Sequence, residues 1–194
     1  MTGSPSAENS LSVGVVIVNW NRLDDTLACL ESVKGSMHPA SCVIVVDNGS
    51  RDSSVKRIQQ AYPDVTVIVN SVNLGFAGGN NKGIEVALDR RVRYVLLLNN
   101  DAAVEPETIG EMIRCASGDP RMGAVGAKIF RMDQPDILDF CYGTVKYDHW
   151  LVSMEGTGLK DHGEFSEEKE VEWISGCCML KINVFIINET IAYR

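Results

Sequence analysis

The residues best suited to chemistry in this chain are three oxygen-bearing side chains in a row, Asn99, Asn100 and Asp101. They follow Tyr94-Val-Leu-Leu-Leu98, an apolar run typical of a strand buried on both faces of a parallel sheet. Open sheets of this kind bind ligands beyond the carboxyl ends of their strands. The Asp101 carboxylate therefore lies where a ligand is expected, and it suits a hard divalent cation. Taken alone, the triplet is explained better by an ordinary Asx turn.

Three other apolar runs end in the same way, which an isolated turn does not explain. They cover residues 13–18, 42–46 and 65–69 and are rich in β-branched residues, which favours strands over helices. The polar residues that follow these three runs are Asn19-Trp-Asn21, Asp47-Asn-Gly-Ser50, Asn70-Ser71 and Asn73. Four polar strand ends predict one polar rim along a single edge of a sheet.

Helical patterns fill the gaps between these runs. Apolar residues recur at helical spacing over residues 23–33, 53–62 and 79–88, and a further helix is expected over residues 106–115, with Pro in its first turn. Asp24 and Asp52 are candidate caps or first-turn acids. The alternation of strand and helix predicts an α/β fold with a mostly parallel central sheet flanked by helices.

Bulk composition favours an enzyme domain over a nucleic-acid-binding or membrane-spanning protein. The chain has 194 residues, and its formal net charge of −8 lacks the basic stripe that nucleic acid requires. No apolar stretch approaches the length of about 18 residues that a spanning helix needs. The six cysteines show no metal-type spacing, so a reducing cytoplasm is the simplest setting.

The sequence changes in texture near residue 118. We expect residues 1–10 to be a disordered tail, residues 11–118 to form an α/β half, and residues 119–194 to form a partial, incomplete second half of the same domain. Another strand is expected over residues 124–130, followed by β-ribbon and loop over residues 137–174. Six acids between residues 161 and 172 are typical of a solvated loop, with an acceptor-recognition surface as the less favoured interpretation.

Phosphate-binding loops do not account for the glycines of residues 75–80. Their spacing does not fit GxGxxG, and no GxxxxGK[ST] motif occurs in the sequence. Gly78 and Gly79 lack a Cβ, which allows a ligand to approach the backbone, although a purely structural need for glycine at a helix start explains them nearly as well.

Five strings in order resemble the family 2 glycosyltransferases, which have the GT-A nucleotide-diphospho-sugar fold, and look most like their rhamnosyltransferase-like branch. The strings are Val15-Val-Ile-Val-Asn-Trp-Asn21, Val45-Val-Asp-Asn-Gly-Ser50, Asn73-Leu-Gly-Phe-Ala-Gly-Gly-Asn-Asn-Lys-Gly83, Leu96-Leu-Leu-Asn-Asn-Asp101 and Trp173-Ile-Ser-Gly-Cys-Cys-Met-Leu180. They extend over residues 13–180, so the resemblance covers most of the chain.

The resemblance implies a role for each matching residue. Asn19 and Asn21 would line the nucleotide pocket, Asp47 would accept a hydrogen bond from the base, and Asn80 would lie near the nucleotide. Asn99-Asn100-Asp101 takes the place of the family's DxD motif, and Asp101 would bind Mg²⁺ or Mn²⁺. The predicted nucleotide-sugar-binding residues are Asn19, Asn21, Asp47, Gly79, Asn80, Asn99 and Asn100.

The function implied is metal-assisted transfer of a hexosyl or rhamnosyl group, with inversion, from a nucleotide-diphosphate donor to an acceptor hydroxyl. The acceptor would be a saccharide or a lipid-linked molecule of cell-wall or polysaccharide biosynthesis. We expect a cytoplasmic protein, with peripheral association at the inner face of the membrane as a further option. No nucleic-acid partner and no transmembrane segment are expected.

The acceptor side of the resemblance is incomplete. Relatives of this kind follow the Gly-Cys-Met-Leu strand with an acidic segment that supplies the general base, whereas here Glu189 is the only acid after residue 180. We therefore expect the general base to be missing. The alternative function is a truncated, catalytically impaired nucleotide-sugar-binding module. A nucleotidyltransferase ranks third, because Arg22 is the only basic residue after the first strand where a basic, glycine-rich loop would be needed.

Overall fold

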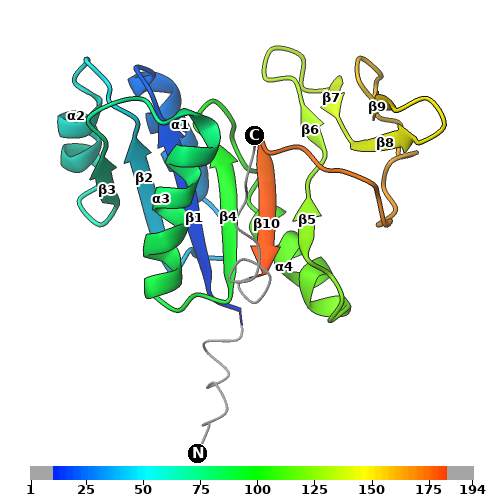
Figure 1. The fold of residues 1–194 in the computed structure, drawn as a ribbon, viewed down its shortest axis with the longest axis horizontal. Coiled ribbons are helices and arrows are strands. Elements are labelled where there is room, and N and C mark those ends of the chain that lie inside the picture. The colour runs from blue at the N-terminus through cyan, green and yellow to red at the C-terminus, as the bar shows by residue number, and fades with distance from the viewer. Residues whose placement is uncertain (1–10, 183–194) are drawn as a thin grey trace, which may run out of the picture.

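A computed structural model describes residues 11–182, and its centre is a six-stranded sheet with the strand order β3-β2-β1-β4-β10-β5 (Figure 1). The four strands on one side are parallel, whereas β10 is antiparallel to both of its neighbours. The strands of this sheet are β1 (Val13–Asn19), β2 (Cys42–Asp47), β3 (Thr66–Val69), β4 (Tyr94–Asn99), β5 (Ala124–Gly126) and β10 (Cys178–Ile182). The predicted α/β fold with a mostly parallel sheet is confirmed.

Helices cover both faces of the sheet, so β1, β2 and β4 are buried on both sides. One face packs against α1 (Leu23–Lys34), α2 (Ser54–Ala61) and α4 (Thr108–Gly118), and the other packs against α3 (Gly75–Asp89). This double burial explains why the strands are continuous apolar runs and not alternating ones.

Parallel register brings the ends of β1, β2 and β4 to one edge of the sheet. Asn19 is aligned with Asp47 of β2, and Val18 is aligned with Asn99 of β4. These ends lie at the top of the view in Figure 1. The polar rim expected from the sequence therefore exists as one edge.

The remaining strands lie beside this sheet as two small antiparallel pairs (Figure 1). They are β6 (Ile129–Phe130) with β7 (Leu138–Phe140), and β8 (Tyr142–Lys146) with β9 (Leu151–Glu155). The β-ribbon expected within residues 137–174 is present as β8 and β9. In contrast, the single strand expected over residues 124–130 is wrong, because β5 joins the main sheet and β6 leaves it to pair with β7.

The expected start of the third helix is also wrong. Helix α3 begins at Gly75, four residues before the expected start, and so contains most of the glycine cluster. Gly79 and Gly83 face the sheet. A Cβ at Gly79 would lie 2.8 Å from Val18 Cγ1, and one at Gly83 would lie 2.3 Å from Val16 Cγ1. Close packing on β1 thus outweighs the low helix propensity of glycine. Helix α4 likewise begins at Thr108, two residues after the expected start.

Within residues 11–182, no helix is both long enough and apolar enough to cross a bilayer.

The close approach of α3 to the sheet can be tested by Gly83→Ala. In an exposed helix this change stabilises by up to about 1 kcal/mol, but here the new methyl group would collide with Val16 and Val46. We expect a net loss of roughly 1–3 kcal/mol in the free energy of unfolding, as for an overpacked core, measured by denaturant unfolding. Gly118→Ala is the matched control, because nothing lies within 4 Å of its Cβ position. Equal stability of the two variants would contradict this packing.

Candidate nucleotide-sugar site

The polar edge of the sheet is built on a buried hydrogen bond between the last residues of β1 and β2. Asn19 Nδ2 donates to Asp47 Oδ2 at 2.8 Å, and neither residue is exposed to solvent. Asn19 Nδ2 also donates to Ser50 Oγ at 3.1 Å, while Asp47 Oδ1 accepts from the Ser50 backbone N–H at 2.9 Å. Asn19 and Asp47, both predicted to bind the donor, therefore hold the turn after β2 in place through these hydrogen bonds.

Ser50 connects this buried pair to the surface. Its hydroxyl oxygen accepts from Asn19 and from the Asn21 backbone N–H at 2.9 Å. Asn21 is exposed, has a positive φ of 54°, and accepts a bond from the Arg51 backbone N–H at 2.8 Å through Oδ1. Because the Ser50 oxygen accepts two bonds, its own hydrogen is left to donate to a ligand. The sequence analysis quoted Ser50 within a motif but did not select it.

Thr26 of α1 joins the first strand end to the Asn99-Asn100-Asp101 turn. Its buried hydroxyl donates to Asn19 Oδ1 at 2.8 Å and accepts from Asn100 Nδ2 at 3.0 Å. The sequence analysis missed this residue. The available signal was a polar side chain at a core-facing helical position, in the same series as Leu30 and Val33.

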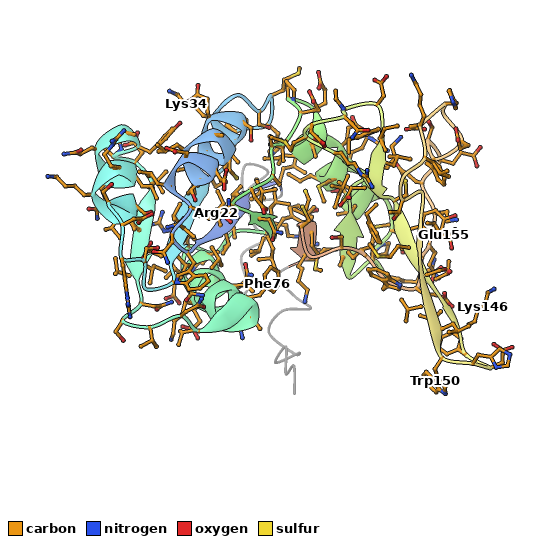
Figure 2. All side chains as sticks on the ribbon, turned by 90° about the horizontal axis from the view of Figure 1, so that it is seen from above. Arg22, Lys34, Phe76, Lys146, Trp150 and Glu155 are labelled. Atoms are coloured by element: carbon orange, nitrogen blue, oxygen red, sulfur yellow. The ribbon has the colours of Figure 1, made fainter. Side chains whose placement is uncertain are left out.

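Asn48 holds the segment that leads into α3. It is almost fully buried, and its amide donates to Asn73 Oδ1 at 2.9 Å and to the Gly75 carbonyl oxygen at 3.1 Å. Its Oδ1 accepts from Asn70 Nδ2 and from the Leu74 backbone N–H. The first turn of α3, with Phe76, is thereby held beside the polar edge (Figure 2).

A cavity of about 180 Å³ lies between α3 and the end of β4. Part of its wall is apolar and part carries amides and one carboxylate. The lining residues are Val18, Phe76, Asn80, Leu98, Asn99, Asn100, Asp101 and Gly176. The structure thus brings together four of the predicted site residues, and adds Phe76 and Gly176 to them.

Asn80 has an unused acceptor at this cavity. The residue is only 5% exposed, and its Nδ2 donates to the Phe76 carbonyl oxygen at 3.0 Å. No hydrogen bond to its Oδ1 is present among residues 11–182. A buried amide oxygen that borders a cavity is suited to accept from a ligand hydroxyl.

Phe76 and Gly176 both line the cavity and approach each other closely. The Phe76 ring would lie 3.1 Å from a Cβ at position 176, so glycine there makes room for the ring. In contrast, the Cβ position of Gly79 is filled by Val18 and Asn48, so packing accounts for that glycine. A contact between Gly79 and the donor remains a prediction.

Asp101 stands between this cavity and a much larger cleft. The cleft has a volume of about 2050 Å³ and is bordered by α4, β5 to β7 and residues 164–175. Leu98, Asn99 and Asp101 line both spaces. The Asp101 side chain is exposed, and it makes no hydrogen bond or ion pair to any other residue of the described range 11–182.

The donor set suits a cation that takes few protein ligands. Among residues 11–182, no group of three His, Cys, Asp or Glu side chains is placed to hold a metal ion, which argues against a site built from protein ligands alone. Mg²⁺ commonly binds one or two carboxylates and completes its shell with phosphate and water. An uncommitted carboxylate at the mouth of a cavity fits that mode.

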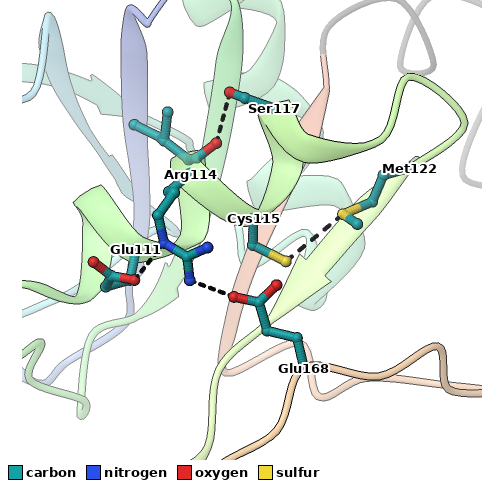
Figure 3. Close-up of polar contacts among 7 residues, drawn as sticks. Glu111, Arg114, Cys115, Ser117, Met122 and Glu168 are labelled. Atoms are coloured by element: carbon teal, nitrogen blue, oxygen red, sulfur yellow. Dashed lines mark hydrogen bonds and ion pairs between the residues drawn. The ribbon is translucent and has the colours of Figure 1, made fainter.

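Ion pairs tie the acidic run of residues 161–172 to the wall of the cleft. Arg114 of α4 pairs with Glu168 and, at 2.7 Å, with Glu111 (Figure 3). The Arg114 guanidinium lowers the pKa of Glu168 below its usual range. Lys128 pairs with Asp161 at 2.6 Å. The run is therefore a border of the cleft, at least in part, and not only a solvated loop.

The Cys177 thiol is affected by the negative charge of Asp101. Burial raises the pKa of its thiol to about 11, and the negative charges of Asp101 and Asp139 add to the shift. The backbone carbonyl of Cys177 accepts from the Asn99 N–H at 2.8 Å, which places the two residues side by side. The remaining predicted catalytic candidate, Glu189, lies outside the described residues, as do residues 1–10.

Comparison with known proteins identifies the family of this chain. The sequence profile of glycosyl transferase family 2 matches residues 14–147, which is more than half of the sequence. The chain belongs to glycosyl transferase family 2.

Individual relatives agree with this assignment. The chain is 28% identical over 155 residues to an N-acetylglucosaminyl-diphospho-decaprenol L-rhamnosyltransferase of Mycobacterium tuberculosis, covering 71% of this chain and 50% of the relative. It is 34% identical over 101 residues to the low-salt glycan biosynthesis hexosyltransferase Agl10 of Haloferax volcanii, covering 52% of this chain and 31% of the relative. The chain thus spans about half the length of the first relative and about a third of the second.

A solved structure supports the fold. S. aureus TarS, residues 1–349, in complex with UDP-GlcNAc, matches with a TM-score of 0.50 and 19% identity, covering 61% of this chain and 34% of that one. The resemblance to family 2 glycosyltransferases expressed by the five sequence strings is therefore confirmed.

The Thr26 link between α1 and the two strand ends can be tested in this family 2 domain by Thr26→Val. Valine keeps the shape but removes the donor to Asn19 Oδ1 and the acceptor for Asn100 Nδ2. We expect the free energy of unfolding to fall by about 1–3 kcal/mol, measured by denaturant unfolding. Thr26→Ser keeps the hydroxyl and serves as the matched control. Equal losses in the two variants would mean that the methyl group, not the hydrogen bonds, stabilises the site.

The effect of the negative charge of Asp101 can be tested through the reactivity of the Cys177 thiol. The thiolate is the reactive form, and nearby negative charge disfavours it. Asp101→Asn removes that charge, so the Cys177 pKa should fall and its alkylation at neutral pH should accelerate. Peptide mass spectrometry with fragmentation separates Cys177 from Cys178. Cys42 is the internal control, because Asp101 does not contribute to its raised pKa. If the alkylation rate of Cys177 relative to that of Cys42 is unchanged, the charge of Asp101 does not act on the Cys177 thiol.

Proposed function

We propose that this chain transfers a sugar from a nucleotide-diphospho-sugar to an acceptor hydroxyl, with inversion and with the help of a divalent cation. The observation that carries the proposal is the uncommitted Asp101 carboxylate at the junction of the small cavity and the large cleft. Membership of glycosyl transferase family 2 and the polar edge of the sheet support it.

The small cavity takes the donor sugar in this proposal. Its amide side chains suit sugar hydroxyl groups, and its apolar wall suits the carbon face of the ring. Asn80 Oδ1 and Asn99 are placed to bind hydroxyl groups. The 3.1 Å approach of Phe76 to the Cβ position of Gly176 limits the size of the sugar on that side.

The nucleotide lies over the edge formed by the turns after β1 and β2. Asn21 and the Ser50 hydroxyl are the groups that reach the ligand from this edge. Asn19 and Asp47 act mainly through Ser50, since both are fully buried and their polar atoms are already engaged. Direct acceptance of a base N–H by Asp47 would require one of these bonds to open.

Asp101 and Asn100 complete the donor site beside the diphosphate. Asp101 would hold Mg²⁺ or Mn²⁺, and a bound cation would stabilise the negative charge that develops on the departing nucleoside diphosphate. Asn100 is oriented for this site by Thr26. The acceptor enters from the large cleft, so that its hydroxyl meets the sugar close to Asp101. A saccharide or a lipid-linked acceptor is proposed, the latter in keeping with the decaprenol-linked substrate in the name of the mycobacterial relative.

The role of Asp101 is tested by isothermal titration calorimetry of Asp101→Asn with uridine, thymidine and guanosine diphosphates, each with and without Mn²⁺. We expect the parent chain to bind one of them more tightly with the cation, and the variant to lose this cation-dependent gain. An exposed carboxylate without a partner contributes little to packing, so the variant should keep the unfolding midpoint of the parent. Asp89→Asn, at the opposite end of α3, is the control for a general loss of negative charge.

Turnover separates transfer from binding alone. The donor selected by calorimetry is incubated with the chain, and release of the nucleoside diphosphate is measured with and without saccharide and polyprenyl-diphosphate acceptors. Acceptor-dependent release is the expected result. Cation-dependent binding without any acceptor-dependent release would instead favour the alternative, a nucleotide-sugar-binding module. Equal affinity of parent and Asp101→Asn in the presence of Mn²⁺ would remove the metal role.

A further inference from the structure

The β8–β9 ribbon is amphipathic, and residues 11–182 leave most of its apolar face uncovered. In an antiparallel pair, residues directly opposite each other share a face. Val145 is paired with Val152 and Gly143 with Met154, so these residues form one face. The alternate pairs, Tyr142 with Glu155, Thr144 with Ser153 and Lys146 with Leu151, form the other, which is mostly polar.

The polar face is satisfied within the described residues. Ser153 Oγ donates to Glu155 Oε1 at 2.7 Å, and Thr144 Oγ1 lies 3.2 Å from the same oxygen. These bonds lower the pKa of Glu155. The Lys169 ammonium lies 3.5 Å from the centre of the Tyr142 ring on this side. This face therefore contacts residues of its own chain over the pairs nearest the body of the molecule, whereas Lys146 and Leu151 beside the turn are exposed.

The apolar face is covered only at its base. There the Trp173 ring lies directly over Gly143, where any side chain would collide with it. Beyond that point Val152 is 62% exposed and Met154 is 53% exposed. Exposed apolar residues that gather on one face of one element, and are not scattered, indicate a contact with something outside the chain.

The turn of the ribbon adds two aromatic rings. Trp150 is 78% exposed and Tyr147 is 62% exposed, and their ring centres lie 6.0 Å apart. In Figure 2 the ribbon extends away from the body of the molecule, with Lys146 and Trp150 near its far end. Trp and Tyr at the end of a projecting element are the side chains that favour the boundary between water and lipid.

The size of the exposed face favours a lipid surface over a protein partner. Two aromatic and three aliphatic side chains offer on the order of 500 Å², given 150–250 Å² for a buried aromatic, whereas a stable protein interface uses roughly 800 Å² from each partner. A bilayer needs no matching surface, so a small apolar tip is sufficient. The charged residues of the turn, Lys146, Asp148 and His149, nearly cancel, and no carboxylate lies on the apolar face itself.

We propose that the apolar face and aromatic turn of the β8–β9 ribbon insert into the surface of a lipid bilayer. The proposal deepens the proposed function, on which it rests for the lipid-linked acceptor, because a docked ribbon would hold the adjacent cleft near acceptors embedded in the membrane. Insertion is driven by apolar burial, so it should persist at high salt, where attraction between surface charges is screened.

The test is co-sedimentation of the 194-residue chain with phosphatidylcholine vesicles. Trp150→Asn suits the positive φ of 51° at this position, and Val152→Thr keeps a β-branched residue in the strand, so the double variant should fold. We expect its partition onto vesicles to fall about tenfold or more, because two apolar side chains leave the bilayer. Met37→Gln is the matched control, since Met37 is 73% exposed and belongs to the segment between α1 and β2, outside the ribbon.

Several results would overturn the proposal. They are absence of vesicle binding by the parent chain, equal binding by parent and double variant, or loss of binding when salt is raised. A further one is self-association of the parent, seen by light scattering without vesicles and lost in the double variant, which would make the face an interface between copies. Nucleoside diphosphate binding is measured in parallel without vesicles. A chain that binds vesicles but no nucleotide would contradict the proposed function and leave the ribbon proposal standing.

Discussion

Strand β1 is paired in parallel on both sides and covered by helices on both faces, and this position determines how the site is built. Its last residue, Asn19, is polar but has no access to water. A buried amide without partners costs about 1–3 kcal/mol, and its three hydrogen bonds to Asp47, Ser50 and Thr26 offset that cost. Those same bonds place the turn after β2 and, through Thr26, the side chain of Asn100. Stability and ligand geometry therefore depend on one network.

The parallel half of the fold and its polar edge could be predicted from the sequence for a physical reason. A strand buried on both faces must be apolar throughout, and the residue that ends it is the first that can be polar, so the ends of the apolar runs mark the edge directly. How deeply each polar side chain at this edge is buried could not be predicted in this way. Asn19 and Asp47, both predicted to bind the nucleotide, are the last residues of their strands and lie beneath the turn, and their contact with the nucleotide remains a prediction. The exposed groups of the same motifs are Asn21 and the Ser50 hydroxyl.

Two features depend on contacts that local patterns do not describe. The glycines of α3 read as breaks in a helix, yet they are the residues that allow this helix to approach Val16 and Val18. Strand β10 pairs with β4 across about 80 residues of sequence, and its antiparallel direction cannot be inferred from five residues of ordinary strand composition. The splitting of the expected strand over residues 124–130 follows from β10 as well, because β5 pairs with it and β6 does not.

Strand β10 explains why the small cavity and the large cleft meet at Asp101. Its pairing with β4 brings the preceding residues Gly176 and Cys177 beside Asn99, and the Asn99 N–H donates to the Cys177 carbonyl. Gly176 then faces Phe76 from the start of α3, so the cavity has one wall from each half of the chain. On the proposed function, the sugar is held by both halves, while the cation lies at the one carboxylate that borders both spaces. A shift of β10 along β4 would therefore alter the donor pocket and the acceptor entrance together, which couples sugar size to acceptor access through a single strand pairing.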